Sequence, residues 1–166
     1  RSLVGSEMCI RDRCAENGFA PQSIQRLRSV ILYLIDRCGG VFNTKMNKLL
    51  FYIDFLNYRR HGQAITGMSY RAIQYGPVPV RWDRVYSLLD DVEQDLVELE
   101  SGATGTRLVS IAKPDLSLFS KAELSTLETV ADCFKEVSAT EISALSHKEE
   151  AWKQFVGTSL AVSYTH

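Results

Sequence analysis

Apolar residues recur at three- and four-residue spacing over residues 21–38, which predicts a first helix. Pro21 suits the first turn of this helix, and Gly39 and Gly40 supply a C-terminal stop. The same spacing predicts a second helix from a cap at Asn43 or Thr44 to about residue 60, ended by Gly62. The second helix is apolar on two faces, so we expect it to be the central helix, packed on several sides. The first face comprises Met46, Leu49, Leu50, Ile53 and Leu56, and the second comprises Phe51, Tyr52, Phe55 and Tyr58.

The helical period is lost over residues 64–74, which predicts a short extended segment. This segment leads into Gly76-Pro77-Val78-Pro79, which is excluded from the interior of a helix or of a central strand and predicts a shaped turn. Residues 80–92 predict a third helix, with Val85, Leu88, Leu89 and Val92 facing inward.

The last third of the chain predicts a hairpin and then three more helices. Residues 96–99 and 107–111 are β-like runs around a turn at 101–105. Residues 120–137 predict a helix with a capping box formed by Ser120 and Glu123, and Thr140 can cap a short helix that ends at Leu145. A second capping box at 146–149 predicts a last helix containing Ala151, Trp152 and Phe155. The expected fold is mainly α within the α+β class, with five to six helices and a small antiparallel hairpin.

Composition favours a single core and excludes several classes of protein. The chain has 166 residues, 45% of them hydrophobic, which is enough for one domain. No apolar run approaches the ~18–20 residues that span a bilayer, which favours a cytoplasmic protein. The four cysteines, Cys9, Cys14, Cys38 and Cys133, are scattered and form no zinc-binding or disulfide pattern. We therefore expect no metal and no cofactor.

The net charge of −1 hides an asymmetry between two halves of the chain. Residues 21–85 hold ten Lys or Arg and three Asp or Glu, whereas residues 86–154 hold six and fourteen. One interpretation is a basic surface that meets an acidic partner or nucleic acid. The other, which we favour because the basic residues are spread out, is that the two halves fold together and offset one another.

Both ends of the chain differ from the rest. Residues 1–13 begin without Met, show no periodicity and closely resemble translated sequencing-adapter read-through, "SLVGSEMCIRDR", and residues 162–166 resemble the matching string at the other end. We therefore expect residues 14–161 to form a single native domain, and the natural protein to extend beyond this fragment.

Residue patterns that would indicate an enzyme are absent. We find no nucleophile triad, phosphate loop or HExxH motif. His61 lies at a predicted helix end, where a cation suits the helix dipole, and His147 lies in a predicted capping turn. Pairing of His147 with Glu150 in a hydrolase is the remaining enzymatic alternative, although no nucleophile accompanies them.

Basic and aromatic residues gather around the Gly-Pro segment and on the second helix. Arg71, Arg81 and Arg84 alternate there with Tyr70, Tyr75, Trp82 and Tyr86, while Lys45 and Lys48 lie three apart on the helix. Such a set can bind nucleic acid. Because the chain is not basic overall, and because Arg and aromatic residues dominate protein–protein contacts, a partner protein fits this set better.

The series "TKMNKLLFYIDFLNYRRHGQAITGMSYRAIQYGPVPVRWDRVY" resembles the Panacea domain, the SocA-like antitoxin domain of bacteria and phages. The resemblance covers about residues 24–156 and rests on an ordered combination of motifs. These are a lysine-leucine-leucine aromatic helix, an "ITG" segment with Gly67, the turn with Gly76, Pro77 and Pro79, and a late Ser146-His147 followed by Trp152.

The resemblance implies a non-enzymatic, mostly helical antitoxin that binds a toxin protein encoded beside it. In some members of the family this domain acts as an adaptor that hands the toxin to a cellular protease. Longer related proteins carry an upstream helix-turn-helix domain that binds operator DNA, so the alternative is the partner-binding half of a transcriptional regulator. As candidates for toxin contact we name Lys45, Lys48, Tyr75, Arg81, Trp82 and Arg84.

Overall fold

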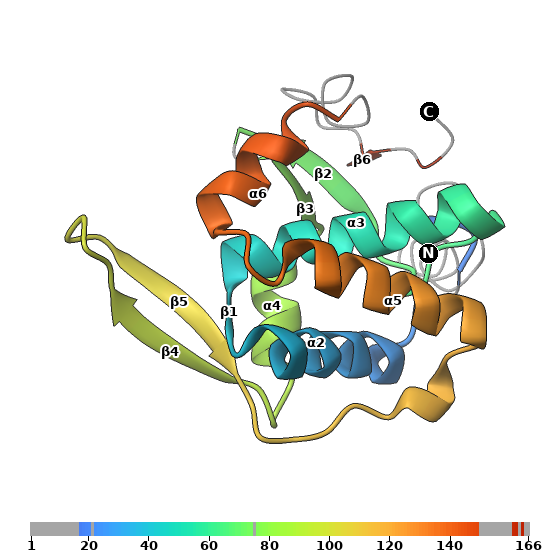
Figure 1. Cartoon of the computed structure of the whole chain (residues 1–166), viewed down its shortest axis with the longest axis horizontal. Helices are drawn as coiled ribbons and strands as arrows, with labels where there is room; N and C mark the ends of the chain where they lie inside the picture. The colour runs from blue at the N-terminus through green and yellow to red at the C-terminus, as the bar shows by residue number, and fades with distance from the viewer. Residues whose placement is uncertain (1–16, 21, 75, 150–160, 163, 165–166) are drawn as a thin grey trace, which may run out of the picture.

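The computed structural model describes residues 17–20, 22–74, 76–149, 161–162 and 164. The described residues form helices packed around one central helix, with two small antiparallel sheets (Figure 1). This arrangement confirms a mainly helical α+β fold. In chain order the elements are α2 Ile24–Cys38, β1 Val41–Phe42, α3 Asn43–His61, β2 Tyr70–Ile73, β3 Gly76–Pro79, α4 Trp82–Ser87, β4 Glu93–Glu98, β5 Thr104–Val109, the 3-10 turn η2 Leu116–Leu118, α5 Lys121–Phe134, α6 Ala139–Ser146 and β6 Ala161–Val162.

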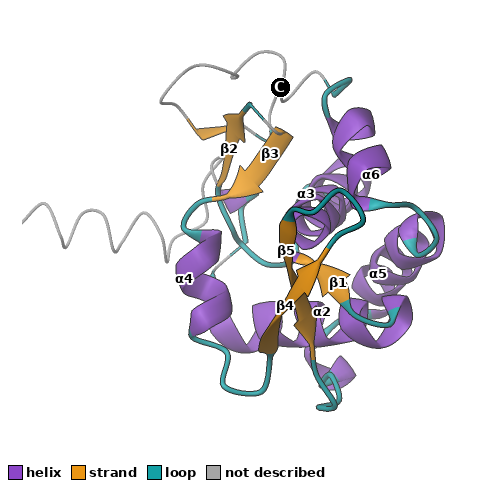
Figure 2. Ribbon diagram, turned by 90° about the vertical axis from the view of Figure 1, so that its left-hand side faces the viewer, coloured by secondary structure: helices purple, strands orange, loops and turns teal. Residues whose placement is uncertain are grey.

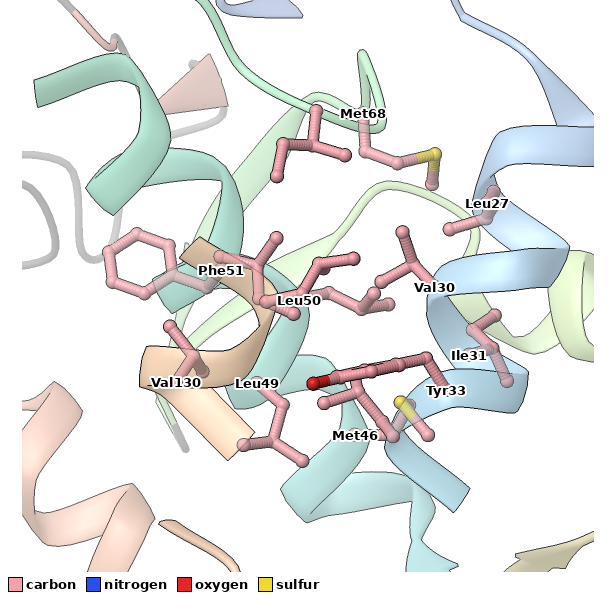
Figure 3. Close-up of a cluster of buried hydrophobic side chains, with 14 of the residues drawn as sticks. Leu27, Val30, Ile31, Tyr33, Met46, Leu49, Leu50, Phe51, Met68 and Val130 are labelled. Carbon is pink, nitrogen blue, oxygen red and sulfur yellow. The ribbon is translucent and has the colours of Figure 1, made fainter. Parts of the chain in front are cut away.

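The central position predicted for α3 is confirmed. Helix α3 contacts α5, α6 and β3, and it packs against α2 through interlocking apolar side chains (Figure 3). Both apolar stripes of the sequence lie in or against this core, which explains why α3 lacks a polar face along most of its length. The shared core includes Leu27, Val30 and Ile31 from α2, Met46, Leu49, Leu50 and Phe51 from α3, and Leu127 and Val130 from α5.

The two long helices end as predicted but begin differently. Gly39 and Gly62 take left-handed conformations and terminate α2 and α3. Helix α2 is capped by Ser23, whose hydroxyl accepts from the Arg26 amide, so the helix begins three residues after Pro21. The predicted cap of α3 by Asn43 or Thr44 is wrong, because β1 runs directly into the helix and leaves extended Phe42 in the cap position.

The two sheets have the strand orders β1-β5-β4 and β3-β2-β6. The predicted hairpin is confirmed as β4 and β5, which pair from Glu93 opposite Val109 to Glu98 opposite Thr104. Strand β1, which the sequence pattern did not predict, pairs with the base of β5 and ties the hairpin to α3. The rest of the hairpin projects from the helical body (Figure 1).

The Gly-Pro segment is a strand, and the prediction of a turn is corrected. Gly76 to Pro79 form β3, which pairs with β2 from Ile73 to Tyr70. Proline is tolerated there because β3 is an edge strand, on which a missing amide donor costs nothing toward the open side. The exclusion of this segment from a central strand therefore holds.

Helix α4 is shorter than the predicted third helix. Arg81 adopts a left-handed backbone with φ 58°, so the helix begins only at Trp82, and it ends at Ser87. Leu89 and Val92 are buried as predicted, whereas Leu88, the C-cap of the helix, is 69% exposed.

Helix α5 has the predicted capping box of Ser120 and Glu123. Helix α6 has another box, formed by Ser138 and Glu141, which replaces the predicted cap at Thr140. Ser146 is the last residue of α6 and His147 its C-cap, so the prediction that Ser146 opens a new helix is wrong. The helix predicted with Ala151, Trp152 and Phe155 lies outside the described residues.

Ion pairs join the two halves of the sequence. Among the described residues, three pairs join a cation of the basic half to a carboxylate of the acidic half, namely Arg26–Glu123, Arg28–Asp91 and Arg37–Asp132, and a fourth, Lys113–Asp36, joins the halves in the opposite sense. Near the end of the chain, Tyr164 is buried and its hydroxyl donates to the Met68 carbonyl, 3.0 Å away. The native boundaries of the domain, at residues 14 and 161, stay predictions.

Candidate functional site

Lys48 lies in the interior, beneath the Gly-Pro strand. Its side chain is 0% exposed, and its Nζ donates to the Pro77 carbonyl at 3.1 Å. Among the described residues no carboxylate lies within ion-pair distance of this amine. Burial without a counter-charge disfavours the ammonium form and lowers the pKa of Lys48 from 10.5 to about 8.

Gly76 makes room for Lys48 and Ser146 at the start of β3. Its φ is +106°, and a Cβ built there would lie 2.6 Å from both Lys48 Cε and Ser146 Oγ. The Ser146 hydroxyl, also buried, donates to the Ser143 carbonyl at 2.8 Å. Three motifs that are far apart in the sequence therefore meet at one point, from α3, β3 and α6. We call Lys48, Gly76, Pro77 and Ser146 the lysine cluster.

Lys45 also faces inward. Its side chain is 8% exposed, and its Nζ donates to the carbonyl of Lys135, the C-cap of α5, at 3.3 Å. A cation at this position interacts favourably with the unpaired carbonyls that end a helix. The two lysines named as toxin-contact candidates therefore join elements of this domain, and a partner docked on this structure does not reach Lys48.

Three other candidates form a surface at the start of α4. Arg81 and Arg84 are exposed and lie three residues apart across the first turn, with Trp82 half-buried between them. We call Arg81, Trp82 and Arg84 the α4 surface. The last candidate, Tyr75, lies outside the described residues.

The α4 surface is held in place by Tyr86, which joins it to α3. The ring of Tyr86 packs 5.8 Å from that of Trp82, and its buried hydroxyl donates to Asn47 Oδ1 on α3 at 2.6 Å. The preceding turn is held by a hydrogen bond from the Val80 amide to the Ser69 carbonyl at 2.8 Å. Arg81 takes its left-handed backbone directly after this bond, a conformation that costs a non-glycine residue about 1–2 kcal/mol.

The two arginines of the α4 surface carry charge that the described residues do not offset. Arg26, Arg28 and Arg37 of α2 are each paired with a carboxylate, whereas no carboxylate of the described residues lies within ion-pair distance of Arg81 or Arg84. Two exposed guanidinium groups in the same helical turn as an indole ring can therefore bind acidic and aromatic groups of a partner.

The sequence pattern missed a buried carboxylate network around Asp54. The Asp54 carboxylate accepts from the Ile65 and Thr66 amides, at 2.9 and 2.8 Å, and from the hydroxyls of Thr66 and Tyr70. Burial raises the pKa of Asp54, while these four donors act in the opposite direction. A signal was present, because an acidic residue within the apolar stretch "FYIDFL" needs partners. The network shapes the loop before β2 around Gly67, whose φ is +72°.

Among the described residues, no group of three side chains is suited to hold a metal ion. A cavity of about 370 Å³ between α2, α3 and α5 is lined by Arg26, Asn57, His61 and Glu123 among others, and Arg26 is already engaged in ion pairing there. His61 ends α3 as predicted, and His147 is the C-cap of α6.

The fold and the site define a mainly helical α+β domain in which a buried lysine supports a proline-containing edge strand beside an exposed arginine surface. The chain belongs to the antitoxin SocA-like, Panacea domain family, whose model matches residues 46–153. This match covers the lysine cluster and the α4 surface. Comparisons with curated proteins and with solved structures give no match. Among the described residues, no helix is both long and apolar enough to cross a membrane.

Proposed function

We propose that this chain is the antitoxin of a bacterial or phage toxin–antitoxin system and neutralises a toxin protein by direct, non-enzymatic contact. The observation that carries the proposal is the family match over residues 46–153. The architecture is consistent with it, because the family motifs fall on a packed scaffold that displays a charged and aromatic surface. The toxin is proposed to contact the α4 surface, where Arg81 and Arg84 have no carboxylate partner among the described residues.

Co-expression in bacteria tests the proposal. The intact gene is expressed together with its neighbouring gene, and growth is compared with expression of the neighbour alone. We expect the neighbour to arrest growth and the intact gene to restore it. A neighbour that arrests growth in the presence of the intact gene as well contradicts the proposal. The amount of toxin, followed by immunoblotting, separates two routes, because neutralisation by contact leaves it unchanged while an adaptor for a protease lowers it.

A matched pair of double variants tests the α4 surface. Arg81→Glu with Arg84→Glu reverses both exposed charges, and we expect rescue of growth to be lost. Arg59→Glu with Arg60→Glu makes the same change at the exposed end of α3 and is expected to leave rescue intact. Equal rescue by the two double variants, each shown to be folded by circular dichroism, would remove the α4 surface from the contact.

A further inference from the structure

The two sheets differ in how their outer edges are protected. The edge formed by β3 is buried along its length, carries two prolines, and is covered by α3 and α6. The edge formed by β4 is exposed at five of its six residues, and no other described strand pairs with its outer side (Figures 1 and 2). An open edge exposes backbone donors and acceptors that another extended chain can pair with.

The direction of the free backbone groups follows from the end of the hairpin. The Leu99 amide donates to the Ala103 carbonyl at 2.8 Å, so residue 99 directs its amide and carbonyl toward β5. Because these groups alternate along an antiparallel strand, residues 97, 95 and 93 also face β5. Gln94, Leu96 and Glu98 therefore direct their amides and carbonyls to the open side, where they form a ladder of three residues.

The side chains of this edge combine one apolar group with negative charge. Leu96 is 77% exposed, and it lies on the same sheet face as Leu108, which is buried in the core at the base of the hairpin. Residues 93–100 carry four carboxylates and no Lys or Arg, namely Glu93, Asp95, Glu98 and Glu100, and all four are exposed.

The negative charge of the β4 edge determines which kind of strand can pair with it. A second copy of β4 would bring its own four carboxylates against these four, and like charges on adjacent strands destabilise pairing. An extended segment that alternates basic and apolar residues would meet opposite charges instead, and its apolar side chains could cover Leu96. The edge therefore favours a basic partner strand over self-association.

We propose that the open edge of β4 binds an extended basic segment of a partner protein by strand addition, through the backbones of Gln94, Leu96 and Glu98. That this partner is the toxin rests on the proposed function. Binding of a basic strand to the edge is tested without the toxin, so failure of one proposal is distinguishable from failure of the other.

The experiment follows amide hydrogen exchange in the full chain by NMR, with and without an alternating lysine–valine octapeptide. We expect the peptide to slow exchange of the amides of Gln94, Leu96 and Glu98, and to do so less at ~1 M salt than at ~0.1 M. The same peptide with glutamate in place of lysine is expected to leave exchange unchanged. Unchanged exchange with the lysine peptide, or equal protection by both peptides, would overturn the proposal. Protection in the free protein that grows with its concentration would assign the edge to a second copy and overturn it as well.

Three variants test separately how the backbone donor, the Leu96 side chain and the negative charge contribute to peptide binding. Leu96→Pro removes one outward donor and leaves the bonds to β5, so peptide binding is expected to be lost. Leu96→Thr keeps the donor and is expected to retain most of the binding. Neutralisation of Glu93, Glu98 and Glu100 to Gln alters no backbone group and is expected to weaken binding about tenfold. Full binding by Leu96→Pro, with Val97 still protected against exchange, would exclude strand addition at this edge.

Discussion

Lys48 illustrates at the scale of one residue how burial changes the chemistry of a side chain. Its amine has one hydrogen bond, to the Pro77 carbonyl, and the described residues supply no carboxylate beside it. The pKa of about 8 therefore reflects loss of hydration that one carbonyl does not replace. The same hydrogen bond holds β3 against α3. Lys48 therefore positions this strand, but burial of its ammonium group lowers the free energy of unfolding.

The pH dependence of stability should show this cost. The pKa of Lys48 is about 8 in the folded state, against 10.5 as its ordinary value, so the unfolded chain binds more protons between these limits. The free energy of unfolding therefore rises with pH from about 8 to 10.5, by up to about 3 kcal/mol for the full shift. Lys48→Met cannot titrate and should lack this contribution.

Urea unfolding at a series of pH values measures the difference between the wild-type protein and Lys48→Met. The buried tyrosines, whose pKa values are raised by burial, are present in both proteins and cancel in that difference. We expect the difference to be constant below pH 8 and to shift in favour of the wild type above it. A difference that stays constant up to pH 10 would show that Lys48 is hydrated in solution.

At the scale of elements, the absence of a side chain at Gly76 allows β3 to pack against Lys48 and Ser146. Gly76→Ala would force an alanine into φ +106° and place its Cβ 2.6 Å from Lys48 Cε and Ser146 Oγ. Gly102→Ala in the hairpin turn is the matched control, because φ there is +84° and nothing lies within 4 Å of a built Cβ. We expect a loss of about 1 kcal/mol for the control and of at least about 3 kcal/mol for Gly76→Ala, by denaturant unfolding. Equal losses in the free energy of unfolding would mean that the lysine cluster accommodates the added Cβ without further destabilisation.

The helices could be predicted from the sequence, whereas the N-terminal caps of α2, α3 and α6 could not. The apolar period of α2, α3 and α5 reports burial directly, so the elements and their inward faces were predicted correctly. A cap depends on the direction from which the chain enters the helix. Phe42 occupies the cap position of α3 because β1 pairs with β5, a contact over 60 residues apart in sequence, so local preference for Asn43 or Thr44 was overridden.

The site was harder to predict, because the exposure of a side chain depends on which other elements pack over its helix. The sequence of that helix alone does not show this. Lys45 and Lys48 are three apart on α3, a spacing that suits a common basic face. In the structure the C-terminus of α5 covers one lysine, while β3 and α6 cover the other. Arg81 and Arg84, beyond the end of the edge strand, are exposed, and their contact with a toxin stays a prediction. Periodicity within one element thus indicates which residues share a face, and tertiary packing decides whether that face meets solvent.

At the scale of the whole molecule, the basic and acidic halves of the sequence are joined by contacts of unequal strength. Arg28–Asp91, Arg37–Asp132 and Lys113–Asp36 involve side chains with substantial exposure, and exposed pairs contribute about 0–1 kcal/mol each. The Arg26–Glu123 pair is less exposed than the other three, and Glu123 also completes the capping box of α5. Arg26 thereby connects the start of one helix to the start of another.

Arg26 also holds two loops. Its guanidinium donates to the Ile65 carbonyl at 3.1 and 3.2 Å and to the Leu118 carbonyl at 2.6 Å, and it lies 5.0 Å from the centre of the Phe119 ring. Arg26→Met would leave both carbonyls and the Glu123 carboxylate without this donor. We expect it to lower the free energy of unfolding by about 3 kcal/mol. Arg28→Met removes the same charge from the same helix at an exposed pair and should cost less than about 1 kcal/mol.

Urea unfolding of the two variants, with the wild-type protein as reference, measures this contrast. Both substitutions remove one positive charge from α2, so a general effect of net charge would lower stability by the same amount in each. A larger loss for Arg26→Met means that the halves are held together through hydrogen bonds from Arg26 to the Leu118 carbonyl and the Glu123 carboxylate, which act at short range and resist salt. Similar losses would mean that their attraction is spread over the surface, and added salt should then reduce both losses together.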